Sequence, residues 1–481
     1  MERFSTGIAE LDLVLGGGLP AGAMVMLAGP PGTGKTILAE QICFANATAR
    51  RKAIYYSTVS EPPSKLISHL EGFDFFDQSA LLERVEFINL GDLLQGDTAD
   101  TLDAVLDEVV RKIVQEQPAL VVIDSAKALR DFTGQRPLRA AVYNLATRVA
   151  PTGCSLLFLG EYSRHEIESG PEFSLADGII ELAYESREPI DRRWLRVIKM
   201  RSSDHLEGQH SIRIGRAGLE VFPRLETVAR SLADMVEPET RISSGVPGLD
   251  GMMGGGIPAA EATAVLGASG SGKTVLALRF ITQGLENGER CLYVSFQERS
   301  HQLIRKAASF GWDLAGAIEA GKLTIYHVPH GQLNLDVVAT AIREQLVLGP
   351  PRRVVLDSLA ELVVAARESD RFPAYSRALL GLIQSVGASM VVTGETTTLG
   401  PVAAPAGGLS FLFQNVLFLR YIEQDSEIRR AIGIIKMRDS DHEKGLRQFT
   451  IGPHGFEVGA KLEGLTGLLG WTALIGQETP I

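Results

Sequence analysis

Short apolar runs alternate with longer amphipathic segments along the first part of the chain. The runs read MVMLAG, AIYYST, ALVVIDS and SLLFLGE, and the amphipathic segments begin at Lys35, Pro63 and Arg136. This alternation predicts a buried parallel sheet whose strands are joined by crossover helices. From Gly178 onward, two closely spaced strand candidates, GIIELAYE and WLRVIKM, predict an antiparallel extension of the sheet. The pattern therefore predicts an α/β fold.

The second half of the chain repeats the motifs of the first at a spacing of about 235 residues. Lys35 in GPPGTGKT matches Lys273 in GASGSGKT, ALVVIDS matches RRVVLDS, and IKMRSSDH matches IKMRDSDH. The leucines near the C-terminus recur at near-helical spacing, although glycines interrupt them. We therefore expect two homologous domains at residues 1–228 and 239–458, a linker at 229–238 and a tail at 459–481.

The composition is that of a folded globular protein and limits its functions. Of the 481 residues, 45% are hydrophobic and 22% are charged, so each domain can bury a core. The formal net charge of −11 argues against tight binding along a nucleic-acid duplex, because neutralisation of phosphates by Lys and Arg dominates that affinity, and it leaves a local basic channel open. The sequence lacks a signal-like start and any apolar run of about 18 residues, which predicts a cytoplasmic protein without a membrane anchor. Cys43, Cys154 and Cys291 lie far apart, so we expect core residues rather than disulfides or a zinc site.

Two glycine-rich segments carry the strongest chemical signal. GPPGTGKT and GASGSGKT both satisfy G-x-x-x-x-G-K-[ST], and each lies between an apolar strand and a helical pattern. Their glycines let backbone N–H groups surround phosphate, the helix N-terminus favours negative charge, and the lysine reaches the terminal phosphates. We predict two nucleotide sites, formed by Gly29, Gly32, Thr33, Gly34, Lys35 and Thr36 and by Gly267, Gly270, Ser271, Gly272, Lys273 and Thr274.

A magnesium site is predicted beside each loop. Thr36 and Thr274 end the loop motifs, where a hydroxyl ligates Mg²⁺. Asp124 and Asp357 each close an apolar strand, where a carboxylate would hold the ion directly or through water. The alternative for each aspartate is that it caps the next helix. Its pairing with a loop lysine favours ATP and Mg²⁺ as cofactors.

Glutamates after the neighbouring strands are candidates for acting on the attacking water. Glu61 and Glu298 follow the strand after the phosphate-loop helix, where a general base would be well placed. The alternative for both is a solvated loop glutamate. Glu161 and Glu395 follow the next apolar strand, and they are candidates either for sensing the γ-phosphate or for plain surface acids.

Two pairs of cations lie near the end of each repeat. Lys199 and Arg201, like Lys436 and Arg438, alternate with apolar residues, so the two cations of a pair face one side of a strand. One interpretation is a solvated face. The other is that they reach the γ-phosphate of a neighbouring subunit in trans, where arginine fingers contribute about 10³- to 10⁵-fold in rate. The second interpretation requires a ring of subunits.

With these residues in place, the chain resembles the KaiC family, the double-domain RecA-like ATPases of the bacterial circadian clock, over nearly its whole length. The resemblance rests on the two phosphate loops, the opening S-x-G-x-x-x-L-D-x-x-x-G-G-G, FGWDL at Phe310 to Leu314, and KMR-x-S-x-H at Lys199 to His205 and at Lys436 to His442. It implies two tandem RecA-like P-loop domains, a homohexamer of two stacked rings, and ATP with Mg²⁺ at subunit interfaces. It also implies hydrolysis in the N-terminal ring, serine/threonine autophosphorylation in the C-terminal ring, and partners of clock or signalling type.

The chain departs from the family pattern in two places. The family carries paired glutamates after the second strand, whereas this chain has Ser60-Glu61 and Gln297-Glu298, and a glutamine accepts no proton at ordinary pH. The family phosphorylates an adjacent Ser and Thr before the last strands, and alignment on Tyr421–Glu423 places Ser410 and Phe411 there. A hydrogen-bonded core serine is the usual occupant of such an apolar stretch, and the other interpretation makes Ser410 a single candidate phosphoacceptor.

Three functions are compatible with these residues. The first is a hexameric signalling ATPase with Ser410 as its candidate autophosphorylation site. The second is a DNA-dependent RecA-like ATPase, which predicts basic or aromatic pore loops and an appended DNA module. The third is a scaffold that binds ATP to assemble and hydrolyses it little, which Ser60 and Gln297 favour.

Overall fold

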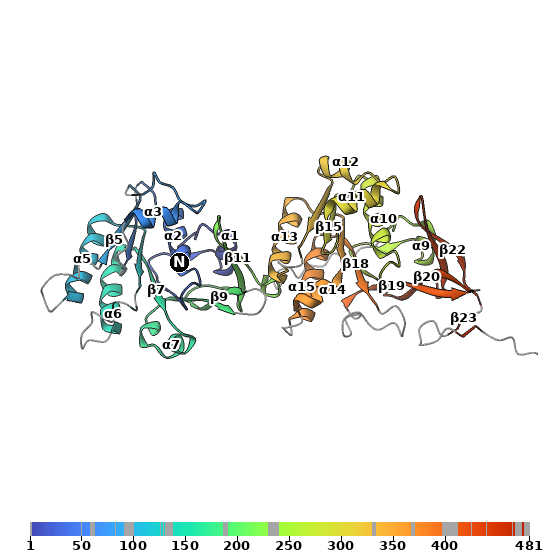
Figure 1. The fold of residues 1–481 in the computed structure, drawn as a ribbon. Helices are drawn as coiled ribbons and strands as arrows, with labels where there is room; N and C mark the ends of the chain where they lie inside the picture. Colours follow the sequence, from blue (N-terminus) through green and yellow to red (C-terminus); the bar gives the residue numbers. More distant parts are fainter. Residues whose placement is uncertain are drawn as a thin grey trace, which may run out of the picture. The chain divides into compact units, whose positions relative to one another are not determined.

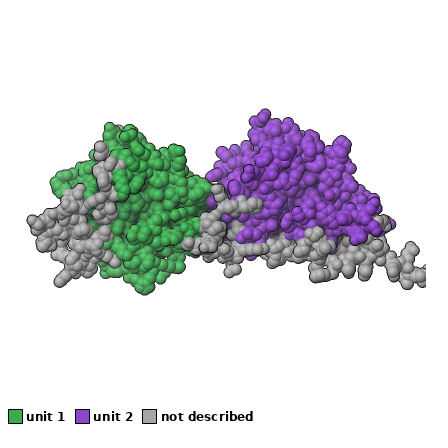
Figure 2. All heavy atoms as spheres, in the orientation of Figure 1, with its two compact units in different colours: residues 1–227 green, residues 228–481 purple. Residues whose placement is uncertain are grey.

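The sequence repeat corresponds to two structural units in a computed structural model of the chain. The units are residues 1–227 and 228–481, coloured green and purple in Figure 2. Each unit holds one copy of the repeated motifs. The structure describes residues 2–49, 51–57, 63–81, 83–90, 101–125, 127, 129, 138–185, 191–228, 240–329, 333–366, 371–396, 412–424, 426–438, 440–463, 465–466 and 474–475.

Unit 1 is built on one nine-stranded sheet (Figure 1). Its strands are β3 (Met24–Gly29), β4 (Ala53–Ser57), β5 (Val85–Asn89), β6 (Leu120–Asp124), β7 (Ser155–Glu161), β8 (Gly178–Glu185), β9 (Arg192–Met200), β10 (His210–Gly215) and β11 (Gly218–Phe222). They lie in the order β11-β10-β9-β8-β3-β7-β6-β4-β5. From β8 to β5 neighbours run parallel, whereas β9, β10 and β11 are added antiparallel. The predicted mainly parallel sheet with an antiparallel extension is confirmed.

Helices cover both faces of this sheet because its central strands are apolar on both sides. α1 (Ala9–Val14) and α2 (Lys35–Asn46) pack on the face that carries Leu27 and Val122. α5 (Thr101–Glu116) and α6 (Leu138–Val149) pack on the opposite face, which carries Met26 and Val121. The other described elements are β1 (Arg3–Phe4), β2 (Leu19–Pro20), α3 (Pro63–Leu70), α7 (Arg164–Ser169), α8 (Leu225–Val228) and the 3-10 helices Ala150–Thr152 and Pro171–Ser174.

Unit 2 repeats the arrangement on a second nine-stranded sheet. Its strands are β14 (Ala262–Gly267), β15 (Cys291–Ser295), β16 (Leu323–His327), β17 (Arg353–Asp357), β18 (Ser389–Glu395), β19 (Asn415–Gln424), β20 (Glu427–Met437), β21 (Arg447–Gly452) and β22 (Gly455–Lys461). The order β16-β15-β17-β18-β14-β19-β20-β21-β22 matches that of unit 1 position by position. Again the last three strands are antiparallel.

The helices of unit 2 also lie on two faces. On one face, buried side chains of α9 (Pro247–Met252), α10 (Lys273–Glu286), α11 (Ser300–Ala308) and α12 (Leu314–Glu319) form one core with the sheet. Elsewhere, α14 (Leu359–Ala366) and α15 (Phe372–Ser385) contact β18, and α13 (Leu335–Leu348) contacts both helices. The remaining pair is β12 (Arg241–Ile242) with β13 (Ile257–Pro258).

The tail is extended where the structure describes it. β23 (Leu465–Thr466) pairs antiparallel with β24 (Leu474–Ile475), so the near-helical spacing of the leucines forms no helix at these residues. Glycine costs about 1 kcal/mol per residue in a helix, which opposes helix formation in this glycine-interrupted sequence. The predicted linker at 229–238 lies outside the described residues. In the described part of the chain, every helix is too short or too polar to cross a membrane.

The cysteines are core residues, as the sequence predicts. Cys43, Cys154 and Cys291 are all free and buried. Burial raises the pKa of Cys154 and of Cys291 to about 12 in each case. Both thiols are therefore protonated at neutral pH, which makes them poor nucleophiles and poor metal ligands.

Candidate nucleotide sites

In each unit the predicted phosphate-binding and metal-binding residues meet at one edge of the sheet. Parallel pairing places Gly29, the last residue of β3, opposite Glu161, the last residue of β7. It also places Asp124, the last residue of β6, opposite Ser57 in β4. The carboxyl ends of strands far apart in sequence therefore converge on the phosphate loop. The equivalent pairs in unit 2 are Gly267 with Glu395 and Ser295 with Asp357.

The phosphate loop joins β3 to α2 through a backbone that favours glycine. Gly34, which precedes α2, has a φ of +98°. A Cβ atom at Gly34 would lie 2.7 Å from Cδ1 of Ile214, and one at Gly29 would lie 1.8 Å from the carbonyl oxygen of Leu182 in β8. The strands beside the loop thus leave room only for glycine. The loop of unit 2 joins β14 to α10 with the same geometry, including a φ of +107° at Gly272.

The loop lysine is held inside the loop by backbone oxygens. Nζ of Lys35 donates to the carbonyl oxygens of Gly29 at 3.0 Å and Pro30 at 2.8 Å. Burial lowers the pKa of Lys35, and the nearby carboxylates of Glu161 and Asp124 partly oppose that shift. Lys273 of unit 2 has the same surroundings, with Gly267, Ala268, Glu395 and Asp357. A buried cation whose nearest counter-charges lie at the loop edge fits a phosphate group.

The predicted metal-binding pair is in direct contact in both units. Oγ1 of Thr36 donates to Oδ2 of Asp124 at 3.0 Å, and Oγ1 of Thr274 donates to Oδ2 of Asp357 at 2.9 Å. Hydroxyl and carboxylate oxygens are the ligands that Mg²⁺ prefers. No group of three or more His, Cys, Asp and Glu side chains among the described residues could hold a metal by itself. An ion here would take its other ligands from nucleotide phosphate and water, as Mg²⁺ commonly does.

A buried hydroxyl in the loop of unit 2 also fits a bound ligand. Oγ of Ser271 is buried, and the structure gives it no hydrogen-bond partner. Leaving a buried hydroxyl unpaired costs free energy. A phosphate oxygen in the loop would satisfy it.

Two tyrosines that sequence reasoning missed also belong to these sites. The hydroxyl of Tyr55 donates to Oδ2 of Asp124 at 2.7 Å, and that of Tyr293 donates to Oδ2 of Asp357 at 2.7 Å. Burial is the main cause that raises the pKa of each tyrosine, and the negative charge of the adjacent aspartate adds to it. Each hydroxyl is therefore a hydrogen-bond donor at neutral pH. The available signal was that AIYYS and CLYVS carry a tyrosine at the same position of the repeat.

The two aspartates differ in the hydrogen bonds that their Oδ1 atoms accept. Oγ1 of Thr393 in β18 donates to Oδ1 of Asp357 at 2.5 Å. The equivalent residue in β7 is Leu159, which has no hydroxyl. Three hydroxyls therefore hold Asp357, whereas two hold Asp124 among the described residues.

The candidate base of unit 2 is engaged by a cation. Oε1 of Glu298 is in an ion pair with Nζ of Lys306 in α11. Its neighbour Gln297 donates through Nε2 to Glu361, which also accepts from Oγ of Ser358 at 2.6 Å. The carboxylate of Glu298 is thus held by Lys306 in this structure.

Two predicted residues lie in parts of the chain without a structural description. These are Glu61, the candidate base of unit 1, and Ser410, the candidate phosphoacceptor. Their roles stay predictions from the sequence.

The cation pair of unit 1 lies at the opposite edge of the sheet from the phosphate loop, because Lys199 pairs with Ile179 near the start of β8. Arg201 forms an ion pair with Asp177 at 3.2 Å, and Asp177 accepts from the backbone N–H of Met24 at 3.1 Å. Nζ of Lys199 lies 3.4 Å from the carbonyl oxygen of Ser174. Met24 begins β3 and Gly29 ends it, which separates the two edges by about 16 Å at 3.3 Å per residue. The cations therefore cannot reach the phosphate loop of their own unit.

Unit 2 repeats this placement. Nζ of Lys436 donates to the carbonyl oxygen of Phe413 at 2.8 Å. The backbone N–H of Arg438 donates to the carbonyl oxygen of Gln414, whose side chain accepts from the N–H of Ala262 at the start of β14. These cations also lie at the edge away from their own loop.

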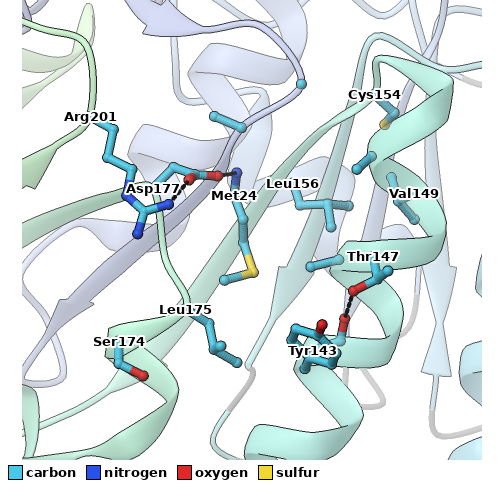
Figure 3. A pocket seen from close by; sticks show the side chains of 14 residues that line it. Met24, Tyr143, Thr147, Val149, Cys154, Leu156, Ser174, Leu175, Asp177 and Arg201 are labelled. Carbon is cyan, nitrogen blue, oxygen red and sulfur yellow. Dashed lines mark hydrogen bonds and ion pairs between the residues drawn. The ribbon is translucent and has the colours of Figure 1, made fainter.

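A pocket of about 350 Å³ opens beside Arg201 and Asp177 in unit 1 (Figure 3). It lies between α6 and the start of β3, and Tyr143, Thr147 and Cys154 contribute to its lining. The edge that carries the cations is therefore hollowed rather than flat.

Fold and site together define a class of protein. A buried parallel sheet, a phosphate loop after β3 or β14, an aspartate at the end of β6 or β17 and an antiparallel extension make each unit a RecA-like P-loop domain. The family model described as "ATPase: KaiC" matches residues 4–226 and 242–463. The chain therefore belongs to the KaiC family of ATPases, with two tandem domains.

Curated relatives match along nearly the full length of the chain. It is 27% identical to "Circadian clock protein KaiC3" of Synechocystis sp., and the alignment covers 100% of this chain and 96% of the relative. It is also 27% identical to "Circadian clock oscillator protein KaiC" of Thermostichus vulcanus and of Prochlorococcus marinus. These alignments cover 98% and 95% of this chain, and 92% and 93% of the relatives.

Replacing Gly29 by alanine tests the geometry of the first loop. The added Cβ would lie 1.8 Å from a backbone oxygen of Leu182, so β8 must shift, and such overpacking costs about 1–3 kcal/mol or more. We expect Gly29→Ala to lower the thermal stability of unit 1 and to reduce the ADP sites counted by calorimetric titration from two to one.

Gly153→Ala is the matched control. Gly153 also has a positive φ, of +70°, but no atom lies within 4 Å of its would-be Cβ. That variant should keep both sites. Two ADP sites of unchanged affinity in Gly29→Ala would show that β8 does not constrain the loop.

Proposed function

We propose that the chain is an ATP-hydrolysing signalling protein that binds one Mg²⁺-ATP in each domain and changes its interactions with nucleotide state. The observation that carries this proposal is the duplicated site, in which a loop lysine, a hydroxyl and a strand-end carboxylate meet at the same edge of each sheet. The relatives, by their names, act in circadian clocks. A signalling role through partner proteins is therefore the biological context that we propose.

Each loop residue has a role in binding or orientation. When bound, Mg²⁺-ATP supplies the γ-phosphoryl group and the positive charge that neutralises its oxygens. Lys35 or Lys273 would hold the terminal phosphates, and the Thr36–Asp124 or Thr274–Asp357 pair would hold the ion. Tyr55 and Tyr293 would fix the orientation of the aspartates through the hydrogen bonds described above.

We assign the faster hydrolysis to unit 1. Glu61 would orient and deprotonate the attacking water there, and Glu298 has the same place in the sequence of unit 2. In unit 2, however, Lys306 engages Glu298 and Gln297 replaces the other acid of the family pattern. Unit 2 would then hold ATP with little turnover. In this proposal unit 1 acts as the ATPase and unit 2 as the ATP-binding scaffold.

We propose that the cations act across subunit interfaces of a homohexamer. Lys199 with Arg201, and Lys436 with Arg438, lie at the edge away from their own loop. In a ring built by one repeated head-to-tail contact, that edge of one subunit can face the phosphate loop of the next. Each site would be completed by the neighbour.

Variants of the loop lysines test the two sites separately. Lys35→Ala and Lys273→Ala should each remove one of two bound ATP equivalents, measured by equilibrium dialysis. Lys35→Ala should remove most of the phosphate release, because unit 1 turns over faster. Glu61→Gln should keep ATP bound while lowering that release about 10²- to 10⁴-fold, as expected for a lost general base.

Lys322→Ala, an exposed lysine of unit 2, is the control for these variants and should behave like the native chain. If Glu61→Gln leaves the rate of phosphate release unchanged, the assignment of the base is wrong. If Lys273→Ala removes most of the turnover instead, the assignment of the faster site is wrong.

Mixed rings test the action in trans. Chains with Lys199→Ala and Arg201→Ala keep Glu61, and chains with Glu61→Gln keep both cations. Co-assembly places a native Glu61 beside a neighbour that keeps Lys199 and Arg201. The rate of phosphate release should therefore exceed the sum of the rates of the two proteins assayed separately. Light scattering with ATP should report a hexamer in every case. Recovery no greater than that sum would contradict a role in trans.

Autophosphorylation at Ser410 is the second candidate activity, which the family alignment at this residue favours. Incubation with Mg²⁺-ATP should add one phosphate per chain by intact mass, and peptide mapping should locate it at Ser410. The variant Ser410→Ala should gain none. Steady phosphate release without any gain in mass would leave an ATPase whose state is set by nucleotide alone.

A further inference from the structure

The opening motif of each repeat lies outside the nucleotide site and has a different structural role. In unit 1 it runs from Ser5 to Gly18, between β1 and β2. Asp12 accepts from Oγ of Ser5 at 2.5 Å and from the backbone N–H of Thr6 at 2.8 Å, which ties the segment after β1 to α1. These contacts fix the position of β1 and of Arg3 within it.

Arg3 uses this position to bind three backbone oxygens. Its Nη1 donates to the carbonyls of Leu15 at 3.1 Å and Gly18 at 2.6 Å, both at the end of the opening motif. Its Nη2 donates to the carbonyl of Ser202 at 2.7 Å, directly after Arg201. A planar guanidinium presents donors in a fixed fork, which an ammonium group does not reproduce.

Two further contacts hold the same loop. Oγ of Ser203 donates to the carbonyl of Leu15, and the backbone N–H of Leu206 donates to the carbonyl of Val14 at 2.8 Å. Ser202 has a φ of +55°, a left-handed conformation that a residue with a Cβ adopts only when its surroundings hold it there. The opening motif and Arg3 together clasp the loop that follows the cation pair.

Unit 2 contains a similar clasp. Nη1 of Arg241 donates to the carbonyls of Met253 and Gly256, at 2.8 Å each, and its Nη2 donates to Oγ of Ser440. The backbone N–H of Glu443 donates to the carbonyl of Met252 at 2.8 Å. In both units the arginine binds two carbonyls at the end of the opening motif and one oxygen of the loop after the cation pair, which is the Ser202 carbonyl in unit 1 and the Ser440 hydroxyl in unit 2. This recurrence argues for a function shared by both units.

We propose that Arg3 and Arg241 are positioning residues that hold the loops after Lys199/Arg201 and Lys436/Arg438 for their work on a neighbouring subunit. This inference rests on the proposed action in trans. Misplacing a catalytic group by about 1 Å can cost about 100-fold in rate, so a clasp of this kind matters most where a site is assembled from two chains. Neither arginine touches nucleotide in this scheme.

The proposal makes a prediction that depends on which chain carries the change. In mixed rings, the Glu61→Gln chain donates the cations, and the Lys199→Ala/Arg201→Ala chain supplies the working site. Arg3→Met in the donating chain should lower the recovered phosphate release about tenfold or more. The same change in the receiving chain should leave the recovery within about twofold, because that chain's cations are already removed.

Three controls separate positioning from a general structural effect. Arg164→Met removes an exposed arginine of unit 1 that pairs with Glu168, and in the donating chain it should change nothing. Protein in which every chain carries Arg3→Met should bind a fluorescent ADP analogue with an affinity within about twofold of that of the native protein. Hydrogen exchange at the amides of Arg201 and Leu206 should become faster in Arg3→Met, and Arg3→Lys should not restore slow exchange.

Each result decides between the proposals. If the donor and receiver with native Arg3 recover no activity, the action in trans fails, and the positioning role fails with it. If they recover activity and Arg3→Met in the donor changes nothing, or equal losses follow in either chain, only the positioning role is overturned. If Arg3→Met does not fold, Ser203→Ala removes one contact of the clasp and should produce the same donor-specific loss in smaller measure.

Discussion

The parallel pairing of β3 with β7, and of β7 with β6, is the constraint on which both the phosphate-loop edge and the cation edge of the sheet depend. It brings the phosphate loop and Asp124 to one edge of the sheet although they are far apart in sequence. β9 pairs antiparallel with β8 and so returns the chain to the other edge, where Arg201 lies. Each domain therefore has one edge suited to receiving phosphate and another that carries cations.

The two domains share this frame and differ in the groups around it. Thr393 gives Asp357 a third hydroxyl donor where unit 1 has Leu159, and Lys306 draws Glu298 into an ion pair. Both differences restrain a carboxylate of unit 2, because hydrogen bonds and ion pairs limit the orientations that an acid can adopt. Duplication of the fold thus preserved the binding geometry while the groups available for chemistry diverged.

Lysine burial and glycine packing explain why the phosphate loop tolerates little change. The loop lysine lies among carbonyl oxygens, and these oxygens together with two strand-end acids oppose the cost that burial imposes on its charge. That geometry exists because β8 and β10 approach the loop closely enough to exclude a Cβ at Gly29 and Gly34. The binding site is therefore continuous with the core of the sheet.

The sequence by itself determined the α/β class, the duplication and the residues of the phosphate loops, because apolar runs, glycine spacing and the repeat are local patterns. It did not reveal the hydroxyl of Tyr55, the ion pair of Lys306 or the carbonyl contacts of Arg3. It also suggested helical spacing in a tail that forms the strand pair β23 and β24. Those features were decided by tertiary structure. Each depends on which strand or loop lies beside the side chain, and strand order and register are set by the packing of the whole sheet rather than by neighbours in sequence.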